Sequence, residues 1–225
     1  MATGLTEVRR RIVAAAERAG RDPGGITVVG VSKYADDAAV VAAHAEGLTD
    51  FGENRAQELA ARSVLLPAGV RWHFVGRLQG NKVRQVRPIV SMLHSLDRSA
   101  LAEHWVKGPG MPPPVLVQVD LAGEVQKGGV APDQAGQLIQ MATSLGLDVI
   151  GLMTVPPLGE RPEDSRPWFR RLRELRDRIR QDHPAIAQLS MGMTDDFEVA
   201  VEEGATVLRI GRAIFDPVPP KGLNQ

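Results

Sequence analysis

The stretch ITVVGVSKYADDAAVVAAHAEG, residues 26–47, contains the unit from which the fold of this chain can be predicted. Its first part is almost continuously apolar and β-branched, which is typical of a strand buried on both faces. An alanine- and valine-rich segment follows, with the composition of a helix that Gly47 would terminate. A strand followed directly by a helix is the repeating unit of parallel α/β folds. Lys33 stands between the two, where the strand should reach the surface.

The same alternation of strand and helix continues to the end of the chain. Further strands are expected at 49–53, 70–76, 91–97, 114–121, 147–155, 187–193 and 206–211. Helices are expected between them at 55–66, 79–86, 99–105, 132–145, 166–182 and 195–203, and an amphipathic helix precedes the first strand. We therefore predict an α/β fold, a single (β/α)8 barrel of the TIM type with an extra N-terminal helix. An open doubly wound sheet is the alternative.

Length and composition limit the classes of protein to which this chain can belong. The 225 residues fit one domain over 1–225, with the barrel itself at about 26–215 and an extended, proline-containing tail after it. Lysine plus arginine equals aspartate plus glutamate at 27 each, so the basic excess of a nucleic-acid binder is missing. There is no cysteine, which excludes disulfides, a thiolate nucleophile and cysteine metal sites. Because no stretch resembles a signal peptide or a membrane span, we expect a soluble, cytoplasmic protein without membrane contact.

Polar residues gather at the predicted C-terminal ends of the strands, where the sites of (β/α)8 barrels are built. The strand bodies, by contrast, are expected to be apolar. The residues at these ends are Lys33, Glu53, Asn54, His73 or Gly76, His94, Ser95, Asp97, Asp120, Thr154, Ser190 to Thr194, Arg209 and Gly211. For His73 two interpretations stay open, since it can line a pocket or brace the core.

Strands seven and eight carry the most informative pair of ends. SMGMTDD, residues 190–196, and VLRIGRAIF, residues 207–215, each run through a glycine toward a helix start, a pattern that binds phosphate through backbone N–H groups. Thr194 can cap the following helix or bind the anion directly. Arg209 alternates with apolar neighbours and is expected to point into the barrel, where a guanidinium needs a dedicated partner. A lysine, a phosphate cradle and an arginine together indicate a pyridoxal phosphate site.

Eight stretches carry a resemblance to a known family. They are VSK, FGENRAQE, WHFVGRLQGNK, HSLD, QKGG, GLMTV, SMGMTDDFEVAVEEGAT and RIGRAIF, which lie between residues 31 and 215. With them the sequence resembles the pyridoxal phosphate homeostasis protein family, whose members are similar to the N-terminal domain of alanine racemase. The resemblance implies a barrel of the alanine racemase cofactor-domain type that binds pyridoxal 5′-phosphate.

The resemblance also implies roles for six residues. They are Lys33 as the Schiff-base lysine, Arg209 as the partner of the pyridine nitrogen, Thr194 with the backbone of Gly211 and Arg212 as phosphate ligands, and Asn54 in the ring pocket. Three positions depart from the family pattern: no proline follows three residues after the lysine, Arg212 replaces a usual threonine, and Asp216 replaces a usual glycine. Because position 212 would contribute its backbone, we expect the guanidinium to leave the phosphate site intact or to strengthen it.

Two classes of function compete. A carrier or regulator of intracellular pyridoxal phosphate, with little or no catalysis, is favoured; its partners would be the cofactor and PLP-dependent apoenzymes, and it is expected to be a monomer. The alternative is a PLP-dependent racemase or lyase. Racemases of the resembling type add a second domain and a tyrosine from a partner subunit, whereas the one tyrosine here, Tyr34, adjoins Lys33 and should point to the opposite face of the strand. A class I aldolase is a third possibility, although residues 147–155 offer no lysine.

Overall fold

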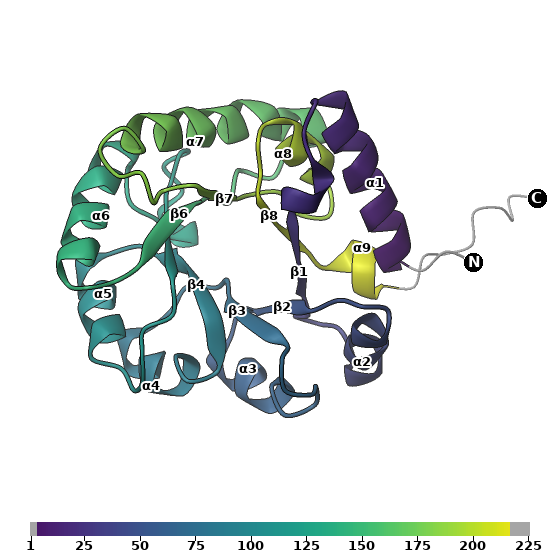
Figure 1. The fold of residues 1–225 in the computed structure, drawn as a ribbon, viewed down its shortest axis with the longest axis horizontal. Coiled ribbons are helices and arrows are strands. Elements are labelled where there is room, and N and C mark those ends of the chain that lie inside the picture. Colours follow the sequence, from purple (N-terminus) through teal and green to yellow (C-terminus); the bar gives the residue numbers. More distant parts are fainter. Residues whose placement is uncertain (1–3, 217–225) are drawn as a thin grey trace, which may run out of the picture.

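The computed structural model describes residues 4–216, except the side chain of Val125, and has a closed barrel of eight parallel strands (Figure 1). The strands are β1 (Thr27–Val31), β2 (Asp50–Glu53), β3 (Arg71–Phe74), β4 (Val90–Leu96), β5 (Val115–Gln118), β6 (Val149–Met153), β7 (Gln188–Ser190) and β8 (Val207–Ile210). Strand β8 pairs with β1, so the barrel closes and the open-sheet alternative is wrong. The predicted (β/α)8 fold is confirmed. Residues 217–225 of the predicted tail lie outside the described part.

Helices follow the strands around the outside of the barrel (Figure 1). The α-helices are α1 (Gly4–Arg18), α2 (Asp37–Ala45), α3 (Ala56–Arg62), α4 (Val83–Val86), α5 (Ser99–Val106), α6 (Ala135–Ser144), α7 (Arg166–Ile179), α8 (Phe197–Glu202) and α9 (Arg212–Phe215). Most of the predicted helices are shorter than expected, and two of them differ most. The segment 55–66 is helical only to Arg62, and 79–86 divides into a 3₁₀ turn at Gly80–Lys82 and the short α4.

The extra N-terminal helix α1 packs against α8 and α9 (Figure 1). Its apolar stripe of Leu5, Val8 and Ile12 is buried, as the helical spacing predicts. On its polar side, Arg11 forms an ion pair with Glu198 of α8 at 2.7 Å. The helix therefore covers the seam where β8 meets β1, which joins the two ends of the barrel sheet.

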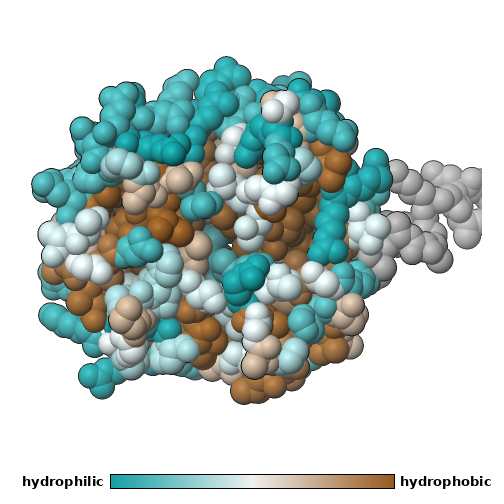
Figure 2. Space-filling model, viewed as in Figure 1, coloured by the Kyte–Doolittle hydropathy of each residue, from teal (hydrophilic) through white to brown (hydrophobic). Residues whose placement is uncertain are grey.

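Helix α7 has the strongest contrast between its two faces. Phe169, Leu172 and Leu175 are buried against the barrel, while arginines cover the other side. In Figure 2 hydrophilic residues cover the rim of the molecule where α7 lies, and hydrophobic residues gather nearer the centre. The helix is thus a solvated outer layer, as its sequence predicts.

The inside of the barrel differs from the prediction. The apolar core lies mainly between the strands and the helices. Inside the barrel, Val29, Val31, Leu116, Met153 and Val207 share the space with buried polar side chains. These polar residues are Asp50, His73, His94, Gln118, Ser190 and Arg209. The expectation that strand bodies are apolar is therefore wrong for the inner face of several strands. Buried polar groups are destabilising unless they are hydrogen-bonded, so these side chains need hydrogen-bond partners inside the barrel.

Candidate functional site

A chain of hydrogen bonds crosses the inside of the barrel. Asp50 Oδ1 lies 3.0 Å from His73 Nε2, and His73 Nδ1 lies 2.9 Å from His94 Nε2. His94 Nδ1 then lies 2.9 Å from Ser190 Oγ, which accepts a 2.6 Å hydrogen bond from Arg209 Nη1. His94 is on β4 and Ser190 on β7, which are not neighbours in the sheet, so this contact spans the barrel interior. We call these five residues the interior chain.

The Arg209 end of the interior chain lies toward the C-terminal end of β8. Its second amino group, Nη2, donates to Thr154 O at 2.8 Å, and the residue is 5% exposed. Burial lowers the pKa of Arg209 to about 10, which still leaves the guanidinium charged at neutral pH. Both hydrogen-bond acceptors are neutral; the charge of Asp196 acts to raise the pKa of Arg209, but among the described residues no carboxylate forms an ion pair with it. A buried cation without an anionic partner fits a ligand that brings an acceptor.

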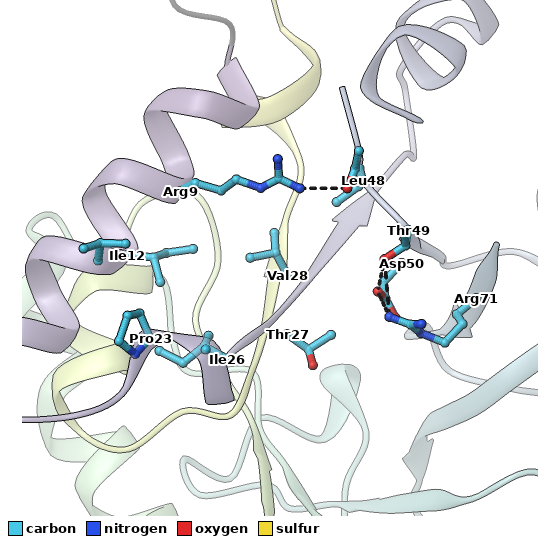
Figure 3. A pocket seen from close by; sticks show the side chains of 13 residues that line it. Arg9, Ile12, Pro23, Ile26, Thr27, Val28, Leu48, Thr49, Asp50 and Arg71 are labelled. Carbon is cyan, nitrogen blue, oxygen red and sulfur yellow. Dashed lines mark hydrogen bonds and ion pairs between the residues drawn. The ribbon is translucent and has the colours of Figure 1, made fainter. Parts of the chain in front are cut away.

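The Asp50 end lies at the opposite, N-terminal end of the barrel, beside a pocket of about 500 Å³ (Figure 3). Figure 3 shows Arg71 and Thr49 turned toward the Asp50 carboxylate. Although burial acts to raise it, hydrogen bonds from His73 and Arg71 lower the pKa of Asp50 to about 2. Asp50 is therefore ionised at neutral pH and gives the interior chain a fixed negative end.

Lys33 lies beyond the end of β1, in an exposed turn. The amide of Ala35 donates to Ser32 O at 2.9 Å, which closes the turn around Lys33 and Tyr34. Tyr34 has φ +69°, an uncommon conformation for a residue with a side chain, and it is 89% exposed. Lys33 Nζ lies 5.7 Å from the centre of the Tyr34 ring. The prediction that the two side chains diverge on a strand is wrong, because both residues lie in the turn and not in the strand.

The Lys33 turn is anchored from outside the barrel. Arg62 of α3 donates from Nη1 to Ser32 O at 2.9 Å and from Nη2 to Ala35 O. Its Nε lies 3.4 Å from Glu53 Oε1, which also accepts a hydrogen bond from Ser32 Oγ. Burial raises the pKa of Glu53, and its Oε2 has no hydrogen-bond partner among the described residues. Arg62 and Glu53 thus hold both ends of the turn while the lysine side chain stays exposed.

Lys33 follows the strand that pairs with the one carrying Arg209. Val29 of β1 is in register with Arg209 of β8. Side chains alternate along a strand, so Val29 and Val31 share the inner face with Arg209, whereas Lys33 lies beyond the strand in the turn. Lys33 Nζ makes no hydrogen bond or ion pair with another described residue. The Lys33 amine is therefore exposed in a turn that follows the strand next to the one that carries the buried Arg209.

The loops after β7 and β8 meet as the phosphate-cradle prediction requires. Thr194 Oγ1 accepts a hydrogen bond from Ala213 N at 3.3 Å, which ties the first loop to the start of α9. Helix α8 begins only at Phe197, so the interpretation of Thr194 as the cap of that helix is wrong. A side chain at Gly211 would approach Val31 O to 3.1 Å, so the end of β8 lies against the end of β1. The first amides of α9, beginning at Arg212, have no acceptor within the helix.

The Arg212 side chain has a partner within the protein and is not reserved for a ligand. It forms an ion pair with Asp195 of the preceding loop, and both side chains are mostly exposed. The guanidinium is therefore partly neutralised by Asp195, while the Arg212 amide stays at the start of α9. A phosphate role for Thr194, Gly211 and Arg212 stays a prediction.

Asn54 lies directly after β2, beside a second pocket of about 600 Å³. Its Oδ1 is buried without a hydrogen-bond partner among the described residues. The same pocket is lined by four cationic side chains, those of Arg55, Arg77, Lys82 and Arg98. An unsatisfied buried amide oxygen at the barrel mouth fits a residue that contacts a ligand. Within 4–216 no group of acidic or histidine residues is suited to hold a metal ion.

Sequence patterns missed most of the interior chain. His73 is buried and bonded on both sides, so it belongs to the barrel interior, whereas Asp50 and His94 were not expected to meet it. Asp50 stands at the N-terminal end of its strand, where no site was expected. The alternation of Arg71 and His73 with the apolar Trp72 and Phe74 is the one local signal that could have suggested a polar interior.

The fold and this arrangement define a (β/α)8 barrel with a lysine, an inward arginine and two adjoining loops at its mouth. The comparisons with known proteins agree with that class. The family model described as "Alanine racemase, N-terminal domain" matches residues 5–219. The chain is 43% identical to the pyridoxal phosphate homeostasis protein of Aquifex aeolicus (strain VF5) over 94% of this chain and 95% of that one.

Solved structures place the fold in the same family. The structure of PipY from Synechococcus elongatus PCC7942 with PLP bound has a TM-score of 0.79 and 32% identity, covering 91% of this chain and 99% of that chain. The chain belongs to the alanine racemase N-terminal domain family and, within it, to the pyridoxal phosphate homeostasis proteins. The lysine/ornithine decarboxylase of Vibrio vulnificus is similar in fold alone, with TM-score 0.69 and 16% identity, and this chain covers 62% of it. In the described residues no helix is long and apolar enough to span a membrane.

Proposed function

We propose that this protein binds pyridoxal 5′-phosphate at the C-terminal mouth of its barrel and acts as a carrier or regulator of that cofactor. The observation that carries the proposal is Arg209, a buried cation bonded only to neutral acceptors, on the strand next to the one that leads to Lys33. When bound, the cofactor supplies an aldehyde that lysine amines hold covalently and reversibly. The names of the relatives, and PLP in the PipY structure, support the same proposal.

Each residue has a distinct task in this proposal. Lys33 holds the aldehyde carbon, and Arg209 donates a hydrogen bond to the ring nitrogen. Thr194 and the amides of Gly211 and Arg212 hold the phosphate, in agreement with the loops that meet there. Asn54 lines the ring pocket, where its unsatisfied Oδ1 gains a partner.

The non-catalytic part of the proposal rests on the groups around Lys33. A racemase needs a second acid or base on the opposite face of the substrate, and the single tyrosine of the chain is beside the lysine in the same turn. A cationic donor such as Arg209 also leaves the ring nitrogen unprotonated, which weakens the ring as an electron sink. We expect slow exchange of the α-proton of L-alanine in deuterated water. Exchange at the enzyme median of about 10 s⁻¹ would favour the racemase alternative.

We further propose that the protein works in the cytoplasm as a monomer and passes the cofactor to PLP-dependent apoenzymes. A transfer experiment tests direct delivery. The loaded protein and an apoenzyme are mixed in one chamber or separated by a dialysis membrane, and reactivation of the apoenzyme is followed. Faster reactivation in the mixed chamber supports contact. Equal rates in both arrangements mean that the cofactor is released first and captured from solution.

A further inference from the structure

The interior chain has a hydrogen-bond direction that is fixed at both ends. A guanidinium can only donate, so Ser190 Oγ accepts from Arg209. An ionised carboxylate can only accept, so His73 Nε2 donates to Asp50. The hydrogens on the two histidines and the serine between these ends must therefore be placed so that every bond has one donor and one acceptor.

The intermediate bonds follow from the one ring hydrogen that a neutral His94 carries. Burial, with His73 and Arg209 nearby, holds the pKa of His94 well below its ordinary value, so one of its ring nitrogens donates and the other accepts. Asp50 takes the hydrogen on His73 Nε2, and we assign His73 Nδ1 as the acceptor of the next bond, so that His94 Nε2 donates to it. His94 Nδ1 then accepts, and the Ser190 hydroxyl donates to it. All four bonds point from Arg209 toward Asp50.

We propose that His94, held by His73, is a positioning residue that aims Arg209 at the ring nitrogen of the bound cofactor. This inference rests on the proposed function. With its hydrogen committed to His94, Ser190 presents a lone pair to Arg209 Nη1 and fixes one edge of the guanidinium. The second edge is fixed by Thr154 O, at 2.8 Å. Bonds that all point one way polarise one another, so the whole chain strengthens the Arg209 contact.

A purely structural role would also explain why these buried groups are paired. Two variants of nearly equal polarity separate the alternatives. His94→Asn places an oxygen near the position of Nδ1 and keeps the contact with Ser190. His94→Gln places its amide near the position of Nε2 and keeps the contact with His73. A structural role predicts similar effects of both variants, whereas positioning through Ser190 predicts a larger loss for His94→Gln.

The cofactor supplies the second control. Its 1-deaza analogue has a C–H in place of the ring nitrogen and retains the aldehyde and the phosphate. We measure Kd for both compounds with the wild-type protein, His94→Asn and His94→Gln, after thermal unfolding shows that each is folded. His94→Gln should bind pyridoxal 5′-phosphate about tenfold more weakly than wild type, the worth of one directed hydrogen bond, while His94→Asn stays within about threefold. All three should bind the deaza analogue within about twofold of one another.

Several outcomes overturn the inference. Equal Kd values for His94→Gln and wild type overturn it, as does an equal loss for the deaza analogue. If wild-type protein fails to bind the cofactor at Lys33, the proposed function and this inference both fail; if it binds there and His94→Gln is unaffected, only the inference fails. Should the variants not fold, nitrogen NMR of the wild-type protein without cofactor at about pH 8, above the ordinary histidine pKa, decides. The proposal requires a proton on His94 Nε2 and none on Nδ1, and the opposite tautomer contradicts it.

Discussion

Lys33 lies in an exposed turn that is anchored through backbone carbonyls, whereas Arg209 lies at the end of a buried chain of side-chain hydrogen bonds. Arg62 donates hydrogen bonds to the turn from the helix side of the barrel, and Ser190 accepts a hydrogen bond from Arg209 inside it. The difference suits two tasks. A lysine that forms and breaks a covalent bond needs a side chain free to move, while a group that recognises the ring nitrogen needs a fixed direction.

The comparison predicts that the Lys33 turn depends on Arg62. Arg62→Ala removes three contacts and leaves the buried Glu53 carboxylate without its cation. We expect unfolding by urea to show a loss of about 3 kcal/mol, the usual cost of breaking a buried pair. In a Glu53→Gln background the loss should be smaller, because no charge is stranded.

The matched control for Arg62 is Arg55→Ala, at the start of the same helix. Arg55 pairs with Glu58 at 3.2 Å, but its side chain is 71% exposed. Exposed pairs contribute little, so the change should be below about 0.5 kcal/mol. If Arg62→Ala costs no more than Arg55→Ala, the turn is not held in the way described.

The fixed negative end of the interior chain predicts an acid-dependent stability. Because the folded pKa of Asp50 lies at about 2, below its ordinary 3.8, its contribution is present above pH 3.8 and disappears as the pH falls through 2. Asp50→Asn should therefore lower the free energy of unfolding by about 2 kcal/mol at neutral pH. The difference from wild type should vanish near pH 2. Denaturant titrations at both pH values measure it.

Asp133→Asn is the control for Asp50. Asp133 is exposed at the start of a helical segment, so its variant should match wild type at either pH. A constant offset between Asp50→Asn and wild type at neutral and acid pH would show that the Asp50 charge does not stabilise the interior chain.

Thr194 tests the phosphate side of the mouth. Thr194→Val removes the hydroxyl but keeps the shape, and it should weaken pyridoxal 5′-phosphate binding by about 1–2 kcal/mol. Thr194→Ser retains the hydroxyl and should bind like wild type. Fluorescence titration with pyridoxal, which lacks the phosphate, should show no difference between the proteins. Equal wild-type affinities for pyridoxal and its phosphate would contradict the cradle.

The smallest effect concerns the strained residue in the Lys33 turn. Tyr34 has φ +69°, where glycine is favoured and a Cβ is not. Tyr34→Gly should be more stable than Tyr34→Ala by about 1 kcal/mol, because alanine keeps the strain and glycine relieves it. Thermal and urea unfolding of the two variants measure the difference. An alanine variant as stable as the glycine variant would mean that the turn is not strained.

The fold could be predicted because its signals are local. Each strand is a short segment with apolar residues on at least one face and is followed by a helix of its own, and the eight units are complete without long-range information. The position of Lys33 after β1 follows from the same pattern. Thr194 was placed in the correct loop, but its hydrogen bond goes to Ala213 of another loop, which no spacing within 190–196 reveals.

The interior chain could not be predicted because it depends on register and closure. His94 and Ser190 are separated by 96 positions and meet only when the sheet closes. The pairing of β3 with β4 also shifts at Trp72/His73, and that of β4 with β5 shifts between Leu93 and Leu96. Such shifts change which face a side chain occupies: Leu93 and Leu96 both face the outer core, so simple alternation along 91–97 cannot assign His94 to the interior.

The most direct test of the central claim is the identity of the lysine that holds the cofactor. Protein incubated with pyridoxal 5′-phosphate is reduced with borohydride, digested, and examined by peptide mass spectrometry, with Lys33→Ala treated in parallel. We predict that the cofactor is fixed to the peptide that contains Lys33, and that Lys33→Ala loses both this label and the visible absorbance of the bound cofactor. Labelling of Lys82 or Lys127 in its place, or undiminished labelling of Lys33→Ala, would contradict the account.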